Sequence, residues 1–209
     1  MHLQPLPRAF YARPVLRVAR DCIGKHLVHD SPEGLCVGRI VEAEAYRGPE
    51  DRAAHSFGGR RTARTEVMFG PPGHAYVFLV YGLHFHVNLV TTAVDMPHAV
   101  LLRAVEPLAG AELMAVRRGI AATRRELTNG PGKLCQAFAI ERRHNAIDLA
   151  APPLFLSEGP RCPVARATRV GIDYAGAWAA RPWRFFDPSS RYVSTRKGVS
   201  ARRSGAEPL

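Results

Sequence analysis

Two glutamates, a tyrosine and a histidine stand close together in the segment IVEAEAYRGPEDRAAH. Glu42 and Glu44 are separated and flanked by apolar residues, as in a buried strand. A carboxylate in such a place costs free energy unless it has a partner or a chemical task. The Gly-Pro turn that follows lets Tyr46 and His55 face each other across a slot. An acid beside two flat side chains suits hydrolysis of a bond next to a flat, π-rich group.

The spacing of the two acids permits either a catalytic pair or one working acid with one structural acid. Alternate residues of a strand share a face, so Glu42, Glu44 and Tyr46 point the same way. Two residues along a strand span roughly 6.6 Å, near the acid separation of inverting glycosidases. We expect one acid to act and the other to bind backbone or an arginine. Arg103, in the apolar stretch VLLRAV, needs an acid partner, and a structural salt bridge to Glu44 or Glu42 would give the same sequence.

A second aromatic stretch, AYVFLVYGLHFHVNLV, has the pattern of a β-hairpin. Tyr76 and Phe78 share one face of its first strand, and Asn88 lies in the returning strand. The tight glycine turn places Tyr81 at the tip, where its own sheet cannot bury it. Such an aromatic is either an ordinary surface residue or a wedge that enters something else, such as a base step.

Several histidines raise the question of a zinc site. His84 and His86 share a face of the returning strand, and His55, His74 and Cys36 are further candidates. Recognisable zinc spacings are absent, including the H-x-E and P-C-x-x-C pattern of the zinc deaminases. Ordinary strand histidines are the simpler interpretation, so we predict no metal and no cofactor.

The sequence NGPGKL, which contains Lys133, superficially resembles a phosphate loop. It lacks the first glycine and the Ser/Thr of the P-loop pattern. Two interpretations remain open: a plain helix start, or a phosphate contact through backbone N–H groups and Lys133. The second fits a DNA backbone better than nucleotide hydrolysis.

Composition and charge narrow the choice of partner. The 209 residues are enough for one well-buried domain. A net charge of +11 and a pI near 10.2 indicate either a generically basic surface or a polyanionic partner. Among polyanions we expect nucleic acid before membrane, because no lipid anchor or basic amphipathic helix is apparent, and no apolar run reaches membrane-spanning length. All but three of the 29 basic residues are arginines, which suit forked hydrogen bonds to phosphate. Four cysteines without a CxxC pair or a secretory leader predict reduced thiols and an intracellular place of action, in cytoplasm or nucleoid.

The elements that position these residues follow from the apolar periodicity. We expect helices at 13–24, 108–118 and 131–140, and strands at 36–46, 75–80, 84–92, 98–106, 153–157, 164–172 and 183–187. This order predicts an α+β fold: a single mixed domain with a curved antiparallel β-sheet, partly open and barrel-like, flanked by helices and a protruding β-hairpin. We expect the domain to cover 1–187, a partly ordered tail to cover 188–209, and the chain to be a monomer.

Taken together, these motifs resemble the alkyladenine (3-methyladenine) DNA glycosylases, the methylpurine glycosylase family of base-excision repair. The matching segments are IVEAEAYRGPEDRAAHSFGGRRTARTEVMFGPPGHAYVFLVYGLHFHVNLV at 40–90, AVLLRAVEPLAG at 99–110, NGPGKLCQAFAI at 129–140 and RVGIDYAGAWAARPWRFF at 169–186. They span most of the chain in the family's order. The resemblance implies a monofunctional glycosylase that flips alkylated or deaminated purines (3-methyladenine, 7-methylguanine, hypoxanthine, ethenoadenine) out of double-stranded DNA. A glutamate-activated water then hydrolyses the N-glycosidic bond.

The resemblance also implies roles for individual positions. Glu44 matches the general base that activates water, and Arg103 matches the arginine beside that acid. Tyr46 and His55 match residues that sandwich a flipped base. Phe78 falls where many relatives carry tyrosine, so stacking survives while any hydroxyl hydrogen bond is lost. The remaining matches are Ala53 and Asn88 in the base pocket, the wedge Tyr81, and the DNA-contacting residues Thr62, Arg64, Met68 and Lys133.

Three other functions remain open. A non-catalytic protein that binds flipped bases in damaged DNA would have the same pocket, but it would not need the Glu44–Arg103 pair. An RNA-binding module would tolerate a 2′-hydroxyl in the substrate strand. A metal-dependent hydrolase would be inhibited by a chelator.

Overall fold

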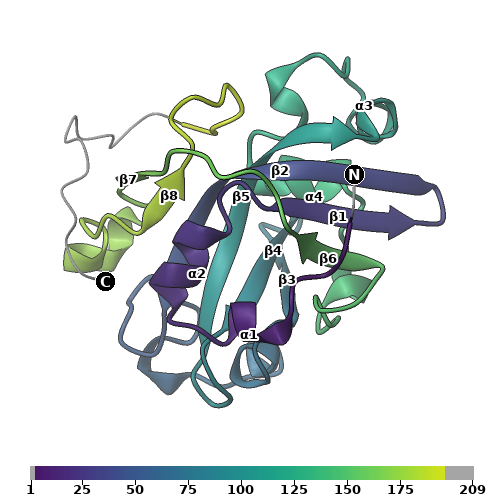
Figure 1. Cartoon of the computed structure of the whole chain (residues 1–209). Coiled ribbons are helices and arrows are strands. Elements are labelled where there is room, and N and C mark those ends of the chain that lie inside the picture. The colour runs from purple at the N-terminus through teal and green to yellow at the C-terminus, as the bar shows by residue number, and fades with distance from the viewer. Residues whose placement is uncertain (1–2, 196–209) are drawn as a thin grey trace.

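A computed structural model describes residues 3–195 of the chain. Its strands are β1 (His26–Ser31), β2 (Gly34–Arg47), β3 (Ala75–Val80), β4 (His84–Thr91), β5 (His98–Ala109), β6 (Leu154–Ser157), β7 (Ala165–Ala167) and β8 (Arg184–Phe186). They form one antiparallel sheet in the order β3-β4-β5-β2-β1-β6, with β8 paired to β2 and β7 paired to β8 (Figure 1). The sheet does not close into a barrel. The expected α+β fold with an open antiparallel sheet is confirmed.

Short helices cover the sheet. The α-helices are α1 (Arg8–Tyr11), α2 (Val15–Asp21), α3 (Ala111–Arg118) and α4 (Pro131–Ala137). Single 3₁₀ turns are η1 (Phe57–Gly59), η2 (Glu66–Phe69), η3 (Arg125–Leu127), η4 (Arg142–His144) and η5 (Asp173–Trp178). Helix α2 packs against β2 and β5, and α4 packs against β4 and β5. Within the described range, no helix is long and apolar enough to cross a membrane.

The two faces of the sheet differ in character. One face is the main apolar core, where Ile40 and Ala43 of β2 and Leu102 of β5 pack in one cluster with the buried faces of α2 and α4. Strand side chains alternate between faces, so the residues next to these in sequence point the other way. That opposite face carries the acids, Arg103 and the hairpin aromatics. The fold therefore separates the chemistry-bearing residues from the main core while keeping them on the same strands.

Strand β2 positions both acids at the centre of the sheet. It pairs with β5 along most of its length, with β1 at 34–39 and with β8 at 42–44. Its register against β5 shifts between Ile40 and Ala43, which marks a β-bulge next to Glu42. Because strands lie on both sides of them, Glu42 and Glu44 are fully buried.

The structure departs from the predicted elements at several places, and three of them concern the sheet. Strand β1 was not predicted, because its sequence HLVHDS mixes polar with apolar residues; its pairing with β2 stabilises it. The helix predicted at 108–118 begins only at Ala111, because β5 runs to Ala109 and Gly110 turns the chain at a φ of 75°. Of the strand predicted at 164–172, only Ala165–Ala167 pairs, and the chain then leaves the sheet.

The last described residues pack against the sheet. The Tyr192 ring lies in a small buried cluster with Val41 and Ala104. The Ser194 backbone N–H donates a hydrogen bond to Glu42 Oε2 at 2.7 Å. Of the tail predicted at 188–209, residues 188–195 therefore contribute to the surroundings of one acid. Residues 196–209 lie outside the described residues.

Candidate active site

Glu42 is held by three groups that leave neither of its oxygens free. Its Oε1 accepts hydrogen bonds from Arg103 Nε at 3.3 Å and Arg184 Nη1 at 3.0 Å. Its Oε2 accepts the Ser194 backbone N–H. Arg184 is itself fully buried. A buried carboxylate with two arginines and a backbone donor is in the setting of a structural anion.

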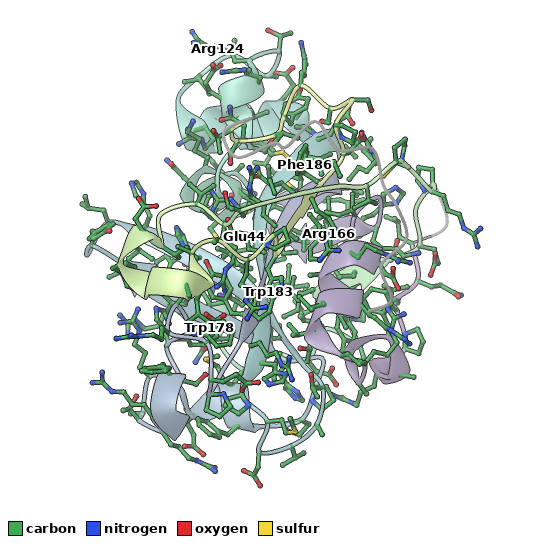
Figure 2. The ribbon with its side chains drawn as sticks, turned by 90° about the vertical axis from the view of Figure 1, so that its left-hand side faces the viewer. Glu44, Arg124, Arg166, Trp178, Trp183 and Phe186 are labelled. Carbon is green, nitrogen blue, oxygen red and sulfur yellow. The ribbon has the colours of Figure 1, made fainter. Side chains whose placement is uncertain are left out.

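Glu44 has a different set of partners. Its Oε1 accepts the backbone N–H of Val170 at 2.7 Å. Its Oε2 accepts the Tyr46 hydroxyl at 2.8 Å and lies 3.3 Å from Arg103 Nη1. Glu44 lies in the interior of the molecule, and the neighbouring backbone N–H of Ala45 donates to the Trp183 oxygen at 2.9 Å (Figure 2). All three partners of Glu44 line one cavity, which places this acid directly behind the cavity wall.

The electrostatics around Glu44 keep Arg103 charged and the Tyr46 hydroxyl protonated. Burial alone would lower the pKa of Arg103, but Glu44 and Glu42 outweigh it and raise that pKa above its ordinary value. For the Tyr46 hydroxyl, burial comes first and the Glu44 charge second, and both raise the pKa well above its ordinary value. Arg103 is therefore a permanent cation, and Tyr46 stays protonated and donates to Glu44.

A cavity of about 370 Å³ collects most of the candidate residues on the polar face of the sheet. This volume suits a small flat molecule. The candidates that line it are Tyr46, Ala53, His55, Met68, Phe78, Tyr81, Asn88 and Arg103. Segments that are far apart in the sequence thus meet at one place. The fold brings the aromatic side chains close to the Glu44–Arg103 pair.

The aromatic residues form one wall of this cavity. The His55 and Phe78 rings meet edge to face with centroids 4.5 Å apart, and the Tyr76 and Phe78 rings are 5.0 Å apart. His55 Nδ1 lies 2.9 Å from the Tyr76 hydroxyl. Desolvation of the ring, followed by the charge of Arg64, lowers the pKa of His55 to about 4. His55 is therefore neutral at pH 7, although part of the side chain remains exposed.

Tyr46 also lines the cavity, and it rests on a buried ion pair that the sequence did not predict. The Arg169 guanidinium lies 4.7 Å from the Tyr46 ring centroid. It binds Asp51 through two hydrogen bonds, at 2.5 and 2.9 Å, and both side chains are fully buried. Asp51 Oδ1 also accepts the backbone N–H of Ala53 at 3.0 Å. One ion pair therefore fixes both an aromatic wall and the loop that leads to His55.

A second unpredicted feature covers the cavity. Val170, Gly171, Ile172 and Tyr174, which come from the loop after β7 and from η5, line it. Of this segment, residues 170–172 were predicted as the end of a strand. Because the chain leaves the sheet at 168, it passes over the polar face and contributes the backbone donor to Glu44. The glycine at 171 was the available sequence signal of a break in the strand, and its φ in the structure is 76°.

Asn88 lies in the interior of the cavity, with 4% of its surface exposed. Its side-chain N–H donates to the Tyr76 backbone oxygen at 3.2 Å. This bond fixes the amide so that its nitrogen faces the backbone. The other polar atom of the Asn88 amide, Oδ1, is thus positioned to face a bound molecule.

Tyr81 lies at the tip of the β3–β4 hairpin. It is 93% exposed, and its φ of 51° is in the left-handed region, which belongs to the tight turn. The neighbouring Leu83 is 77% exposed. These two large side chains form an exposed apolar patch at the hairpin tip. Tyr81 also lines the cavity, so the patch lies next to it.

The remaining candidates lie near the cavity but not in it. Thr62 and Arg64 line an adjoining cavity of about 380 Å³, which shares Ala53, His55 and Tyr174 with the first. Lys133, in α4, donates to Asn129 Oδ1 at 2.8 Å and does not line either cavity. Across residues 3–195, no group of three or more His, Cys, Asp or Glu side chains is placed to hold a metal ion.

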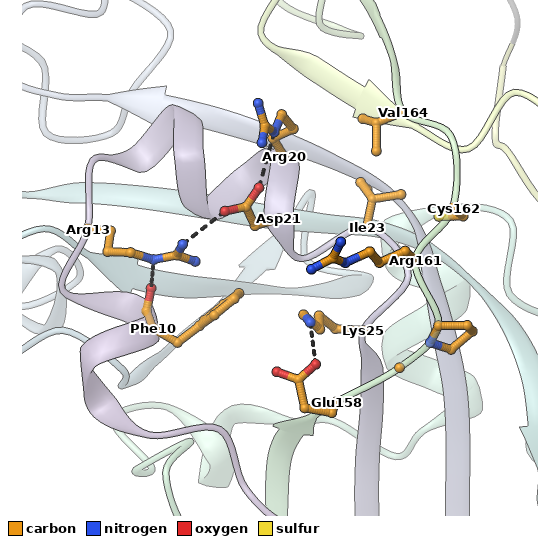
Figure 3. A pocket seen from close by; sticks show the side chains of 12 residues that line it. Phe10, Arg13, Arg20, Asp21, Ile23, Lys25, Glu158, Arg161, Cys162 and Val164 are labelled. Carbon is orange, nitrogen blue, oxygen red and sulfur yellow. Dashed lines mark hydrogen bonds and ion pairs between the residues drawn. The ribbon is translucent and has the colours of Figure 1, made fainter.

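A larger cleft of about 630 Å³ lies between α2 and the segment 158–164 (Figure 3). Several of its charged side chains are paired with one another: Arg13 Nη1 lies 2.9 Å from Asp21, and Lys25 Nζ contacts Glu158. It contains none of the candidate residues. This larger cleft therefore lacks the acids and aromatic side chains that make the smaller cavity the candidate site.

Comparisons with known proteins agree on one family. A family model described as "Methylpurine-DNA glycosylase (MPG)" matches residues 9–191. A protein of Methanocella arvoryzae is 50% identical over 193 residues, which cover 91% of this chain and 96% of that protein. A protein of Desulfitobacterium hafniense is 47% identical over 93% of this chain and 100% of its own length, and one of Clostridium acetobutylicum is 43% identical over 92% and 98%. All three carry the name "Putative 3-methyladenine DNA glycosylase".

Proposed function

The chain belongs to the methylpurine-DNA glycosylase family, and from that premise we propose that it flips alkylated or deaminated purines out of double-stranded DNA and hydrolyses their N-glycosidic bond with water activated by Glu44. Membership makes it a DNA glycosylase, a hydrolase of N-glycosyl bonds that acts in DNA repair. The proposal concerns the bases it accepts and the residues that act. The observation that carries it is the buried Glu44–Arg103 pair, in which Arg103 lines an aromatic cavity and Glu44 lies directly behind the wall.

Binding begins with extrusion of the damaged nucleotide. Unstacking a base costs a few kcal/mol, and damage that weakens pairing lowers this cost. Tyr81, exposed at the hairpin tip, enters the gap in the duplex as a wedge. The flipped base lies between Tyr46 and His55, where aromatic stacking returns roughly 1–3 kcal/mol. Asn88 lies against the edge of the base, where its side chain disfavours guanine through steric conflict with the exocyclic amine.

The hydrolytic step uses Glu44 as general base. Glu44 Oε2 exchanges one of its present partners, the Tyr46 hydroxyl or Arg103, for a water molecule and takes a proton from it. The water oxygen then bonds to C1′ of a sugar with oxocarbenium character. The C1′–N bond breaks and its electron pair stays on the base. The products are an abasic site and a free purine.

The charge of the base sets how demanding each substrate is. 3-Methyladenine and 7-methylguanine carry positive charge and leave readily as neutral molecules. Hypoxanthine and ethenoadenine are neutral, so their departure needs a proton or a hydrogen bond that stabilises negative charge. We therefore place neutral lesions within the substrate range but expect them to depend more strongly on the residues of the pocket.

The proposed enzyme is monofunctional, because neither lysine among residues 3–195 has the place of a nucleophile. Lys25 contacts Glu158 in the separate cleft, and Lys133 is bound to Asn129 outside the cavity. The remaining lysine of the sequence, Lys197, lies outside the described residues. Removal of the base should therefore leave the DNA strand intact until alkali is added.

Single-turnover cleavage of labelled duplexes tests the function and the role of Glu44 together. The duplexes carry one hypoxanthine, one ethenoadenine or no lesion, and methylated DNA supplies cationic purines. We expect alkali-dependent breaks with the wild type, and a loss of roughly 10²–10⁴-fold for Glu44→Gln, which is the contribution of a positioned general base. Lesion binding should be retained.

Glu42→Gln is the matched control, because it removes the same charge from the same buried strand. Both substitutions weaken a contact with Arg103 and can therefore destabilise the fold. Circular dichroism measures the folding of each variant independently of its activity. Folded Glu42→Gln should keep most of its turnover. Equal loss in the two variants would show that Glu44 is structural, and lesion-specific binding by a wild type that cleaves no substrate would identify a damage-binding protein without catalysis.

A further inference from the structure

His86 lines the cavity, yet the mechanism above gives it no task. It lies on β4, two residues closer to the hairpin tip than Asn88. Its ring is 5.6 Å from the Phe78 ring, centroid to centroid, and it is within electrostatic reach of Arg103. His86 is partly exposed, whereas Asn88 is almost fully buried. Along this strand, His86 is therefore the cavity residue nearer the mouth.

The imidazole of His86 has unused hydrogen-bonding capacity. No residue in the described part of the chain forms a hydrogen bond with either ring nitrogen. Burial, followed by the charges of Arg103, His84 and His55, lowers the pKa of His86 to about 4. The ring is therefore neutral at pH 7, with one N–H donor and one acceptor nitrogen. A neutral donor adds no cation that would repel a positively charged purine.

The way in which a nucleotide enters determines which part of the purine meets His86. A flipped base enters the pocket while its sugar stays joined to the DNA backbone. The edge of the purine that carries N9 and N3 therefore remains nearest the mouth. Arg103, which influences the His86 ring, also contacts Glu44 at 3.3 Å, the acid assigned to the water that attacks C1′. His86 is thus on the sugar side of the bound base.

We propose that His86 is a specificity-determining residue that donates its imidazole N–H to N3 of the flipped purine. This inference rests on the function proposed above. When the C1′–N9 bond breaks, the electron pair left on N9 is shared by the ring with N3, so a donor at N3 binds the leaving base more strongly than the intact nucleotide. A neutral purine with a free N3, such as hypoxanthine, gains most. A purine methylated at N3 offers no lone pair there and gains nothing.

An atomic substitution in the substrate, combined with one in the protein, isolates this bond. The substrates are duplexes with hypoxanthine or with 3-deazahypoxanthine, in which a C–H group replaces N3. We expect His86→Leu to slow single-turnover excision of hypoxanthine roughly 10- to 100-fold, as for loss of a hydrogen bond to a charged acceptor. It should not slow excision of 3-deazahypoxanthine further, and release of 3-methyladenine from methylated DNA should be unchanged.

Two further variants separate a hydrogen bond from a packing effect. His86→Gln keeps an N–H donor and should recover part of the rate with hypoxanthine but none with the 3-deaza base. His84→Leu makes the same change two residues away on the same face of β4, at an exposed side chain that does not line the cavity. It should leave all the rates at the wild-type level.

The outcomes distinguish this inference from the function beneath it. A wild type that releases neither hypoxanthine nor methylated purines would overturn the proposed function. A wild type that releases both, with His86→Leu slowing hypoxanthine and 3-deazahypoxanthine by the same factor, would overturn the role of His86 alone. Equal slowing of 3-methyladenine release would also contradict it, because that base has no free N3.

Discussion

The two buried acids differ in where their partners lie. The groups that hold Glu44 all line the cavity, whereas two of the three groups that hold Glu42, Arg184 and Ser194, do not line it. A molecule in the cavity can therefore displace a partner of Glu44 without disturbing the core. This difference supports the chemical task that we propose for Glu44, a choice that the spacing of the two acids in the sequence left open.

At the same scale, the Asp51–Arg169 pair shows how a residue outside the cavity can control it. Asp51→Asn leaves the buried Arg169 charge without its partner, which costs about 3–5 kcal/mol in typical buried pairs. We expect a loss of that order in the free energy of unfolding, measured by urea titration. Because Arg169 also lies against the Tyr46 ring, we expect weaker binding of lesion-containing DNA by the molecules that remain folded.

The neighbouring Glu50 supplies the control for this substitution. Glu50 pairs with Arg47 on the surface, with both side chains about half exposed. Exposed pairs contribute at most about 1 kcal/mol, so Glu50→Gln should leave stability and DNA binding nearly unchanged. Equal effects of the two substitutions would mean that the buried pair has no special part in shaping the pocket.

At the scale of elements, the strands with a short-range sequence pattern were predicted correctly, and the features that depend on contacts between distant residues were not. The hairpin strands at 75–80 and 84–92 agree with β3 and β4 to within one residue, because aromatic alternation and a glycine turn are short-range features. The Asp51–Arg169 pair joins positions 118 residues apart, and no periodicity indicates such a contact. The segment 170–174 that covers the cavity was missed for the same reason. Its apolar residues fit a strand pattern, but only Ala165–Ala167 pair with a neighbouring strand, β8.

The hairpin makes a prediction as an element, because its tip has no packing task. Tyr81→Ala should leave the free energy of unfolding within about 0.5 kcal/mol, as for other exposed positions. It should slow excision from duplex DNA roughly 5- to 150-fold, the equivalent of the 1–3 kcal/mol that an aromatic–base stack supplies. Single-turnover excision from duplex and single-stranded substrates measures the effect. The loss should be smaller with single strands, which have no paired stack to refill.

Val116→Ala is the matched control for the hairpin. Val116 is 80% exposed on α3 and does not line the cavity. Its loss should change neither stability nor excision. If Tyr81→Ala slows excision from single and double strands equally, the side chain acts on the base pocket and is not a wedge.

At the scale of the whole molecule, the large arginine content has two separate uses. Arg103, Arg169 and Arg184 are buried and bind acids or backbone oxygens within the fold. Arginines of this kind hold the sheet and its surroundings together. The net charge of +11 comes from the excess of basic over acidic groups in the whole chain, and it is this excess that attracts DNA. Sequence composition reports the sum of the two uses but cannot divide it.

The histidines give the whole molecule a pH dependence whose sign can be worked out. Desolvation is the first cause of a lowered pKa in six of them: His26, His29, His55, His86, His98 and His144. Below the ordinary pKa of 6.5 the unfolded chain binds protons that the folded chain refuses, so acid favours unfolding. For His55 and His86 this continues until about pH 4. Stability should therefore be highest above pH 6.5 and fall as the pH is lowered toward 4.

Urea titrations at steps between pH 7.5 and 4.5 measure this slope, and His86→Leu identifies one contributor. Three acids have a lowered pKa in the folded chain: Glu66, Glu126 and Asp187. The stability that their ionised form contributes is lost only below their ordinary pKa values of 4.5 and 3.8. The pH dependence of stability above this range therefore comes from the histidines. Removing one buried titrating group should reduce the slope by up to about 1.4 kcal/mol per pH unit. A stability that stays level or rises between pH 6.5 and 4.5 would mean that these rings accept protons in the folded state, and the neutral donor assigned to His86 would then be a cation at mildly acidic pH.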